Sequence, residues 1–357
     1  MTIAIASYQR RDPLVRLLST LDQQLAASPE LREGVEIVVV LDGSTDGSKE
    51  AVEAAAWSVP VHVRWQPNRG LAAARNVGLD AARGGIVWFL DDDLIPSDGL
   101  LERHRRGHVE GPPCVLVGPC RIPPDAPAPA ALLRWWDAFY VDLADGGVID
   151  RFDRFTTANA SAPAALIAAA GGFDERFVAY GLEDYELAVR LLARGTPLLF
   201  DVDAVAWHPD VPSFAVMAAR QRSVGSNAAQ MARLHPEVVE QLFPWCEDSR
   251  PRRLLRRLRL RSPRSLMAMS RLAAALHAPA SRVGEGAAAR MENLAVAAGY
   301  AAGVAEGDPD GALLRRVLGQ EDGVGGGRPW RRAERWRARA SRQPASSPPS
   351  NGSTISR

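Results

Sequence analysis

The sequence has little cysteine and no long apolar run, and each shortage excludes a class of protein. Three cysteines in 357 residues are too few and too scattered for a disulfide framework or a thiolate metal cluster. No apolar run reaches the roughly 18 residues that a membrane-spanning helix needs. The N-terminal apolar stretch is too short for a secretory signal. The sequence therefore predicts a protein of the reducing cytoplasm.

Net charge of either sign is also nearly absent. Lys+Arg number 43 and Asp+Glu 42, which gives a net charge of +1. A surface built for nucleic acid would carry an excess of positive charge, so no nucleic-acid partner is expected. The hydrophobic share of 46% is ordinary for a globular protein, and the length suggests about two domains.

Apolar segments typical of strands alternate with helical patterns over the first part of the chain. The expected strands lie at 2–7, 35–41, 59–65, 86–90, 115–117 and 198–205. The expected helices begin near residue 12 or lie at 44–56, 70–83 and 182–194. The strands are apolar on both faces, which is typical of a sheet covered by helices on both sides. The sequence therefore predicts a doubly wound α/β fold.

The second part of the chain has a different character. The pattern becomes helical and arginine-rich over 213–318, and Gly, Ser, Pro and Arg dominate 319–357, which we expect to be disordered. This divides the chain into an α/β domain at 1–212, a helical region and a tail. Residues 250–261 combine arginines with leucines. Such a helix either binds an anionic membrane surface or packs on the first domain with a solvated basic face.

Carboxylates follow two expected strands at the point where each strand ends. Asp42 follows the second strand, and Asp91, Asp92 and Asp93 follow the fourth. Ligands of open α/β sheets bind outside the carboxyl ends of the strands. Three adjacent carboxylates repel one another unless a cation lies among them, and oxygen ligands suit Mg²⁺ or Mn²⁺. The alternative interpretation is a solvated turn.

Two further features are less specific when each is taken alone. Glu183 and Asp184 lie in the first turn of a predicted helix, where the helix dipole by itself favours acidic residues. His208 follows a predicted strand, and a lone histidine is more often structural than a metal ligand. Here it can complete a metal site begun by Asp93.

Six short motifs, in their order and spacing, resemble the family 2 glycosyltransferases. The motifs are Ser7-Tyr8-Gln9-Arg10, Leu41-Asp42-Gly43-Ser44-Thr45-Asp46, Asn68-Arg69-Gly70-Leu71-Ala72-Ala73-Ala74-Arg75-Asn76, Phe89-Leu90-Asp91-Asp92-Asp93, Gly171-Gly172-Phe173-Asp174-Glu175 and Gly181-Leu182-Glu183-Asp184. The resemblance covers about residues 1–210. It implies the GT-A fold, a mixed nucleotide-binding sheet flanked by helices, and sugar transfer with inversion. It also implies a nucleotide-sugar-binding half at 1–110 and an acceptor half at 111–212.

The resemblance implies roles for the residues that bind the donor. Tyr8 is expected to pack against the nucleotide base, and Asp42 to accept a hydrogen bond from the base N3–H. Leu41 replaces the first of the two acids that the family usually has there. Arg75 is expected near the diphosphate. The family's common habit favours a UDP-sugar over a GDP- or dTDP-sugar.

The resemblance also implies a metal site. Asp91-Asp92-Asp93 matches the Asp-x-Asp motif, with Asp91 and Asp92 towards the ribose and Asp93 as the ligand of Mn²⁺ or Mg²⁺. His208 matches a histidine that some members add as a second protein ligand. Such a cation stabilises the charge that develops on the leaving diphosphate.

The remaining roles concern the sugar and the acceptor. Asn159 and Ser161 are expected where the donor sugar and the acceptor meet. Asp184 matches the catalytic base, with Glu183 beside it at the acceptor or sugar. A positioned base is typically worth 10²–10⁴-fold in rate. We expect the helix dipole to lower the pKa of Asp184, which keeps the base ionised at neutral pH.

Two other functions stay open at this point. A sugar-nucleotide nucleotidyltransferase would need a glycine-rich phosphate loop after the first strand, and residues 7–13 contain no glycine. A non-catalytic nucleotide-sugar-binding module would not need to retain Asp93, Glu183, Asp184 and His208. The acceptor stays open between a polysaccharide, a lipid carrier, a small natural product and a peptide.

Overall fold

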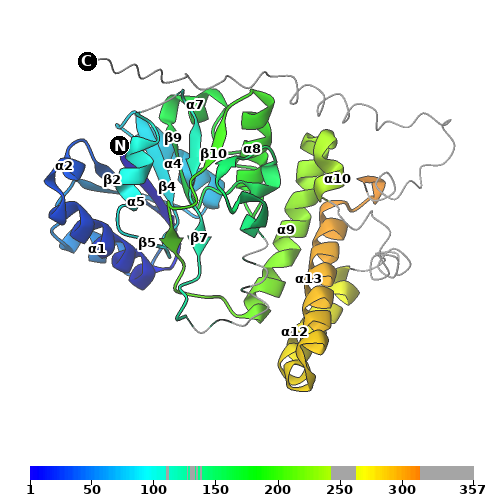
Figure 1. Cartoon of the computed structure of the whole chain (residues 1–357). Coiled ribbons are helices and arrows are strands. Elements are labelled where there is room, and N and C mark those ends of the chain that lie inside the picture. The colour runs from blue at the N-terminus through cyan, green and yellow to red at the C-terminus, as the bar shows by residue number, and fades with distance from the viewer. Residues whose placement is uncertain are drawn as a thin grey trace, which may run out of the picture.

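The computed structural model describes residues 1–109, 112–126, 128, 133, 136, 139–242 and 263–313. An α/β part is followed by a group of long helices at its side (Figure 1). The strands of the large sheet are β1 (Thr2–Ser7), β2 (Glu36–Asp42), β3 (Val61–Gln66), β4 (Ile86–Leu90), β6 (Val115–Val117), β8 (Gly147–Val148), β9 (Asn159–Pro163) and β10 (Leu198–Phe200). Their order in the sheet is β3-β2-β1-β4-β9-β6-β10-β8.

The large sheet is mixed, as the family resemblance implies. β1 pairs in parallel with β2 and β4, whereas β9 runs antiparallel to both β4 and β6. In the register of β1 and β2, Ser7 lies beside Leu41. Tyr8, which follows β1, and Asp42, the last residue of β2, therefore lie at the same edge of the sheet. This edge carries the candidate site.

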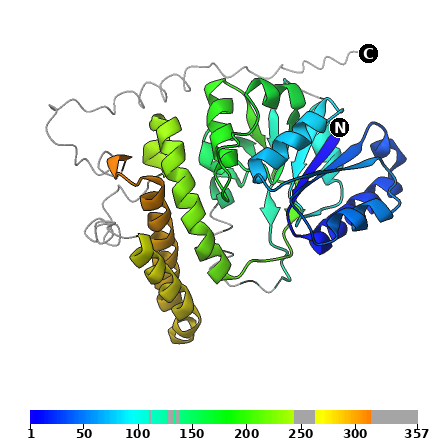
Figure 2. The ribbon, with the colours of Figure 1, turned by 180° about the vertical axis from the view of Figure 1, so that it is seen from behind.

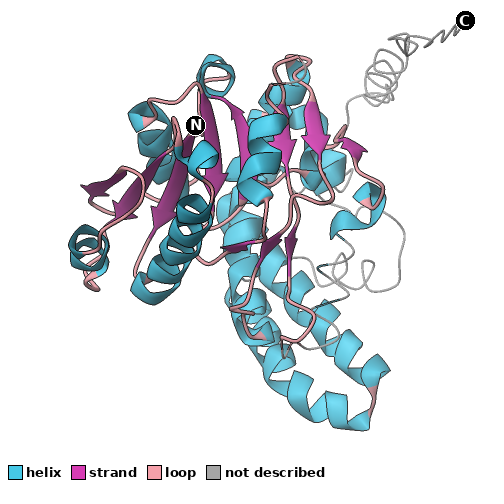
Figure 3. Cartoon of the chain, turned by 60° about the vertical axis from the view of Figure 1, so that its left-hand side comes forward, coloured by secondary structure: helices cyan, strands magenta, loops and turns pink. Residues whose placement is uncertain are grey.

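Helices cover both faces of the large sheet (Figure 3), because alternate strand residues point to opposite sides. Ile3 and Ile5 of β1 face α1 (Arg11–Ala27), α3 (Ser48–Ala54) and α5 (Leu100–Arg106) in one cluster. Ala4 faces the other layer, which contains α4 (Leu71–Ala81), α7 (Ala164–Ala169) and α8 (Glu183–Ala193). The apolar face of α1 has helical spacing and is buried at Leu14, Leu17, Leu18, Leu21 and Leu25.

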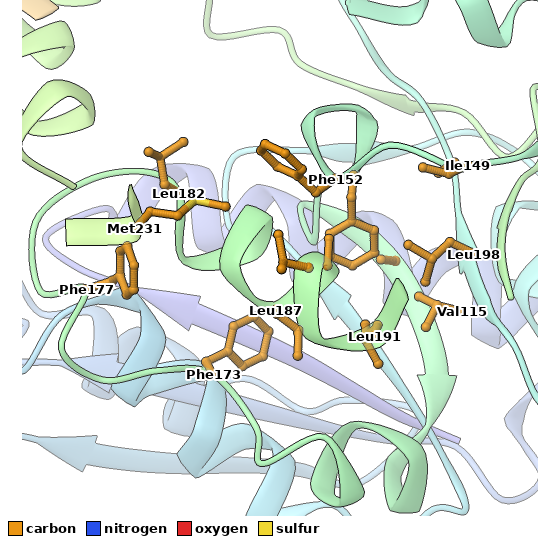
Figure 4. Packing of buried hydrophobic residues seen from close by; sticks show 14 of the residues in the cluster. Val115, Ile149, Phe152, Phe173, Phe177, Leu182, Leu187, Leu191, Leu198 and Met231 are labelled. Atoms are coloured by element: carbon orange, nitrogen blue, oxygen red, sulfur yellow. The ribbon is translucent and has the colours of Figure 1, made fainter. Parts of the chain in front are cut away.

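An apolar cluster packs the helix that begins at Glu183 against one face of the large sheet. Leu187 and Leu191 of this helix lie among Phe152, Phe173 and Leu198 (Figure 4), and all five side chains are buried. The cluster holds α8 against the sheet. It therefore fixes the position of the two acids at the start of α8.

Two predicted elements differ from the observed ones for local reasons. The helix expected from residue 44 begins only at Ser48, because the Asp46 carboxylate accepts bonds from the backbone N–H and hydroxyl of Ser48 and holds a turn there. The strand expected at 198–205 divides at Asp201, whose carbonyl accepts from the N–H of Ala204. The chain leaves the large sheet at this turn.

After this turn the chain enters a small three-stranded sheet. It contains β5 (Ile95–Pro96), β11 (Ala206–Trp207) and β7 (Cys120–Arg121), in that order. β11 runs antiparallel to β5 and parallel to β7. Because β5 follows Asp93 and β11 precedes His208, this small sheet brings those two side chains together.

Helices follow residue 213, as predicted. They are α9 (Phe214–Leu234), α10 (Val239–Leu242), α12 (Pro263–Val283) and α13 (Glu285–Gly307). In both views α9 lies between α13 and the α/β part (Figures 1 and 2). The basic stretch at 250–261 and the tail at 319–357 lie outside the described residues. None of the helices that the structure describes is long and apolar enough to cross a membrane.

The contact between α9 and α13 depends on glycine. An added Cβ at Gly303 would lie 1.9 Å from the carbonyl oxygen of Arg222, and one at Gly225 would lie 2.0 Å from that of Tyr300. Both distances are far inside van der Waals contact, so an alanine at either position would force the helices apart.

We expect Gly303→Ala to lower the melting temperature, with a loss of about 1–3 kcal/mol in the free energy of unfolding, the usual cost of overpacking. Gly286→Ala in the same helix is the matched control, because nothing lies within 4 Å of an added Cβ there. Alanine also has the higher helix propensity. Thermal unfolding followed by circular dichroism compares the two variants. Equal changes in melting temperature would contradict the close contact.

Candidate active site

The loop after β1 is tied to the loop after β2. The backbone N–H of Gln9 donates to the Ser44 hydroxyl at 3.0 Å, and its side-chain amide exchanges two hydrogen bonds with Thr45. Gln9 has a φ of 54°, in the left-handed region. This turn leaves the ring of Tyr8 51% exposed at the sheet edge. The ring is therefore available for stacking by a ligand.

Asp42 lies at this edge, at the end of β2, and its carboxylate already accepts hydrogen bonds from other residues of the chain. Oδ1 accepts from the Gln66 amide at 2.7 Å and from the Arg69 N–H at 2.9 Å, and Oδ2 accepts from the Gly70 N–H at 2.9 Å. A carboxylate offers about four acceptor positions, so Oδ2 retains one for a base N3–H. Asp42 thus shapes the loop before α4, and the base contact stays a prediction.

Asp42→Asn is expected to lower the melting temperature, because an amide N–H₂ would face a donor that Asp42 now satisfies. The cost of such an unpaired buried group is about 1–3 kcal/mol. We also expect weaker UDP binding by the folded protein. Calorimetry and thermal unfolding on the same sample separate the two effects. Parental UDP affinity would remove Asp42 from the base site, and Tyr8→Leu is the companion variant whose exposed position should spare stability.

The three aspartates after β4 have different surroundings. Asp93 Oδ2 lies 2.5 Å from Nη1 of Arg10 and 3.3 Å from Nε2 of His208. Asp92 Oδ1 lies 3.1 Å from the same Arg10 nitrogen. Asp91 is partly exposed and pairs with Arg75 at 2.9 Å. The sequence therefore does not form a solvated turn here, since two of the three carboxylates are buried.

The two buried aspartates have opposite pKa shifts. Burial, together with the charge of Asp93, raises the pKa of Asp92 to about 7. Burial alone would also raise the pKa of Asp93. The hydrogen bond from His208 and the charges of His208 and Arg10 outweigh burial, so the pKa of Asp93 lies well below its usual range. Asp93 is therefore ionised at neutral pH.

The Asp93–His208 pair fits a divalent cation with few protein ligands. The pair combines a buried carboxylate oxygen of Asp93 with a ring nitrogen of His208. The backbone of His208 is fixed, because its N–H donates to the Arg121 carbonyl at 2.8 Å. Asp92 Oδ2 and His208 Nδ1 are buried without partners among the described residues. In the same residues no group of three or more His, Cys, Asp or Glu could hold a metal. Such an ion would take its other ligands from phosphate and water, as Mg²⁺ commonly does.

Arg10 is a site residue whose role the sequence reasoning missed. Its guanidinium bridges Asp92 and Asp93, the carboxylates that a cation would use. The sequence drew attention to Arg10, because it lies in the first motif. Its role was not predicted because its partners lie more than 80 residues away in the chain. A cation bound by Asp93 must share that carboxylate with Arg10 or displace it.

Arg75 connects the aspartates after β4 to the start of α8. Its guanidinium lies 2.9 Å from Asp91 and 2.8 Å from Glu183, and it sits over the ring of Phe173 at 5.5 Å. Arg75 is only 5% exposed. It is therefore a buried link between two carboxylates, and the predicted contact with the diphosphate stays a prediction.

Asp184 is half-buried at the start of α8, next to Glu183. Glu183 pairs with Arg75, whereas Asp184 has no ion pair within 4 Å among the described residues. Burial, followed by the charge of Glu183, raises the pKa of Asp184 well above its usual range. The expectation that the helix dipole would lower this pKa is wrong, because the cost of burying the charge outweighs the dipole.

The turn before Asp184 is strained and held from two sides. Leu182 has a φ of 72°, which is costly for a residue with a Cβ, and it follows Gly181 with a φ of 92°. The Leu182 side chain is buried in the cluster of Figure 4. On the other side, the Asn227 amide of α9 donates to the carbonyls of Ala179 and Gly181 at 3.0 and 2.6 Å. The helical region therefore helps to position the candidate base.

The predicted sugar contacts of Asn159 and Ser161 are wrong. Both residues are 0% exposed, because β9 lies inside the sheet between β4 and β6. The Asn159 amide accepts from the Trp88 indole at 3.1 Å and donates to the Ala204 carbonyl at 2.8 Å. Ser161 lies 2.7 Å from a ring nitrogen of His104. These side chains join strands and helix α5 in the interior and do not face a ligand.

The comparisons with known proteins concern the family and the fold. Residues 2–155 match the family model "Glycosyl transferase family 2". The chain is 30% identical over 278 residues to the validoxylamine A glucosyltransferase of Streptomyces hygroscopicus subsp. jinggangensis, which covers 70% of this chain and 64% of that protein. It is 30% identical over 216 residues to the pre-mycofactocin glycosyltransferase of Mycobacterium tuberculosis, with 58% and 45% covered. The chain thus spans less than two thirds of these curated relatives.

Among solved structures, a mannosyltransferase from Pyrobaculum calidifontis in complex with GDP-Man and Mn²⁺ has a TM-score of 0.57 to this chain. The match covers 85% of this chain and 86% of that chain at 18% identity, so it concerns the fold alone. Taken with the motifs, these findings place residues 2–155 in glycosyl transferase family 2, and the α/β part of the chain has the GT-A fold.

Proposed function

We propose that the protein is an inverting glycosyltransferase that moves a sugar from a UDP-sugar to an acceptor hydroxyl in a single displacement. The observation that carries the proposal is the Asp93–His208 pair at 3.3 Å, at the same sheet edge as Tyr8. The neighbouring Asp91 is joined through Arg75 to Glu183 at the start of α8. Residues 1–110 then bind the donor, and 111–212 supply the acceptor half, with 213–318 as a separate helical region.

The donor half offers an exposed ring and a set of buried charges. Tyr8 stacks on the base, Asp42 accepts from its N3–H, and Asp91 and Asp92 lie towards the ribose. Asp93 and His208 hold Mn²⁺ or Mg²⁺. When bound, the cation stabilises the charge of the leaving diphosphate.

The acceptor half supplies the base. Asp184 takes the proton of the acceptor hydroxyl while that oxygen attacks the anomeric carbon from the face opposite the diphosphate. Its raised pKa brings the base closer to the operating pH, where general bases are most efficient. Glu183 orients the site through Arg75. No covalent intermediate is required, so one displacement inverts the anomeric carbon.

Nucleotide binding and donor hydrolysis test the proposal. UDP with Mn²⁺ should raise the melting temperature more than GDP or dTDP does, because specific binding stabilises the folded state by mass action. Slow release of UDP from UDP-glucose in water is the activity expected without an acceptor. A nucleotidyltransferase would instead release pyrophosphate from a nucleoside triphosphate, and a binding module would release neither. Either of those results would overturn the proposal.

We also propose that the enzyme works in the cytoplasm at an anionic membrane surface, which the basic stretch at 250–261 supports. The protein should co-sediment with phosphatidylglycerol vesicles at low salt and dissociate at high salt, because the attraction is screened. Phosphatidylcholine vesicles are the control. Replacement of Arg252, Arg253, Arg256 and Arg257 by glutamine should abolish the binding. Failure of the parent protein to co-sediment with the anionic vesicles at low salt would contradict this role.

A further inference from the structure

An exposed tyrosine lies in the turn that precedes the candidate base. The side chain of Tyr180 is 52% exposed, and its hydroxyl has no hydrogen-bond partner among the residues that the structure describes. The same turn touches the donor half, since an added Cβ at Gly70 would lie 2.8 Å from the carbonyl oxygen of Val178. Tyr180 therefore lies where the loop before α4 meets the start of α8, and the mechanism described above gives it no role.

The acids of the candidate site act on this tyrosine. Partial burial of the side chain, the largest effect, raises the pKa of Tyr180, and the charge of Arg220 lowers it. Three carboxylates also raise this pKa, namely those of Asp91, Glu183 and Asp184. Because such charge effects fall off with distance, the hydroxyl of Tyr180 lies close to the base.

A guanidinium of the helical region lies over the Tyr180 ring. Arg220 belongs to α9, and its guanidinium carbon is 4.7 Å from the centre of the ring. Arg222 of the same helix pairs with Glu306 at 2.7 Å, whereas Arg220 has no carboxylate within 4 Å in the described part of the chain. Stacking uses the flat face of a guanidinium and leaves the N–H donors at its edge available. Arg220 therefore offers a half-buried, unpaired cation.

The turn and α9 are fixed relative to one another. The Asn227 amide, which bonds the carbonyls on either side of Tyr180, also donates to the Tyr180 carbonyl at 3.4 Å. An added Cβ at Gly181 would lie 3.2 Å from the side chain of Val224. Arg220, Val224 and Asn227 are four and seven residues apart, so they share one face of α9. The ring and the guanidinium are thus positioned before any ligand binds.

The charges at this end of the site favour an anionic ligand. Arg10 and Arg75 each pair already with two carboxylates of the site. Asp184 must be ionised to act as the base, and its charge would repel an anionic acceptor unless a cation compensates for it. Arg220 supplies that cation. A neutral acceptor would leave it unused.

We propose that Tyr180 and Arg220 form the acceptor subsite beside Asp184, and that the acceptor carries a carboxylate or phosphate group near the hydroxyl that receives the sugar. A planar guanidinium binds such an anion through two parallel N–H bonds. The ring of Tyr180 supports the apolar part of the acceptor, and its hydroxyl is available to an acceptor oxygen. The assignment rests on the proposed function, because the acceptor hydroxyl has to reach Asp184.

Binding of small alcohols with and without a charge tests the anion. Glycerol, D-glycerate and sn-glycerol 3-phosphate share a three-carbon backbone and differ in the group at one end. Saturation-transfer NMR follows their binding to the protein alone and to the protein with UDP and Mg²⁺. We expect at least one anionic probe to bind about tenfold or more tightly than glycerol, the scale of a hydrogen bond to a charged group. The two anionic probes distinguish carboxylate from phosphate.

Arg220→Gln should remove the preference for the anionic probe, and Tyr180→Leu, which removes the ring under the guanidinium, should weaken it. Arg222→Gln is the matched control, because it removes the same charge from the same helix at a position that pairs with Glu306 of α13. It should leave the preference unchanged. Circular dichroism checks that each variant is folded.

Release of UDP from UDP-glucose shows whether the bound probe is an acceptor. The anionic probe that binds should accelerate this release in the parent. Glycerol mixed with an equal concentration of the unlinked anion, acetate or inorganic phosphate, should accelerate it less. Arg220→Gln should lose this difference, which is measured as a ratio of rates within each variant.

Three results would overturn the assignment. Equal binding of glycerol and both anionic probes by the parent would exclude the anion site, and a preference that persists in Arg220→Gln would place the anion elsewhere. An anionic probe that competes with UDP, or binds without accelerating its release, would show that Arg220 does not hold the acceptor. Failure of the proposed function itself has a different signature, because the parent would then show neither metal-dependent binding of UDP nor release of UDP in water.

Discussion

Asp93→Ala is expected to abolish sugar transfer and, in the same variant, the part of UDP affinity that depends on Mn²⁺. Asp93 is the ionised, buried carboxylate at the end of β4, and His208 lies 3.3 Å from it. Without Asp93, histidine alone remains to bind the cation. The diphosphate then keeps its charge unscreened, both in the bound donor and as it leaves.

Calorimetry with UDP, with and without Mn²⁺, measures the effect directly. Glu306→Ala is the matched control, because Glu306 also pairs with an arginine, Arg222, but lies in the helical region, between α13 and α9. The fold of each variant is checked by circular dichroism at the assay temperature, since loss of Asp93 also unpairs Arg10. Mn²⁺-dependent UDP binding that survives in a folded Asp93→Ala protein would remove Asp93 from the metal site.

Arg10 offers a second measurement that does not depend on the nucleotide. The guanidinium lies against the same oxygen of Asp93 that faces His208. A divalent cation must therefore compete with it. Arg10→Gln should bind Mn²⁺ alone more tightly than the parent, as measured by electron paramagnetic resonance of free Mn²⁺. Weaker binding of Mn²⁺ would show that Arg10 does not oppose the cation.

The sheet was largely predictable because its determinants are local. Strand β1 matches the expected bounds at 2–7, and the helix expected to begin near residue 12 is α1, Arg11–Ala27. The antiparallel strand β9 was missed as such. This strand, Asn159–Pro163, is short and consists mostly of small residues. Its direction depends on pairing with β4 and β6, which lie far away in the chain.

The site was predictable as a set of residues but not as a set of contacts. The motifs located the acids, yet the partner of each acid comes from a distant segment, as for Arg10 with Asp93 and Arg75 with Glu183. Burial is likewise a property of the folded chain. It moved Asn159 into the interior, and it reversed the expected direction of the pKa shift at Asp184.

Asp184→Asn is expected to lower the rate of UDP-glucose hydrolysis at least about 10²-fold, the usual magnitude for loss of a general base. Asparagine keeps the size of the side chain and its hydrogen bonds but cannot accept the proton of water or of a sugar hydroxyl. Binding of UDP with Mn²⁺ should be retained, because Asp184 lies outside the donor contacts. Asp142→Asn, which removes a surface aspartate paired with Arg154, is the control.

The raised pKa of Asp184 should be visible in the pH dependence of the hydrolysis rate of the parent protein. The base works only when ionised, so the rate is expected to fall as the pH drops through that pKa. Glu183→Gln removes a neighbouring negative charge and leaves Arg75 without its partner at 2.8 Å. Both changes favour the ionised form of Asp184. The acidic limb of the profile should therefore move to lower pH, and an unmoved limb would assign it to another group.

Stability provides the decisive comparison on the same Asp184→Asn variant. Between the usual aspartate pKa and the raised pKa of Asp184, the folded protein keeps a proton that the unfolded chain has lost. Stability therefore falls as the pH rises through this window, and the ionised carboxylate is a net cost at pH 8. Asp184→Asn removes that cost, so its melting temperature at pH 8 should equal or exceed that of the parent while the rate collapses. If Asp184 served only to stabilise the start of α8, the variant would instead melt at lower temperature and hydrolyse UDP-glucose at the parental rate.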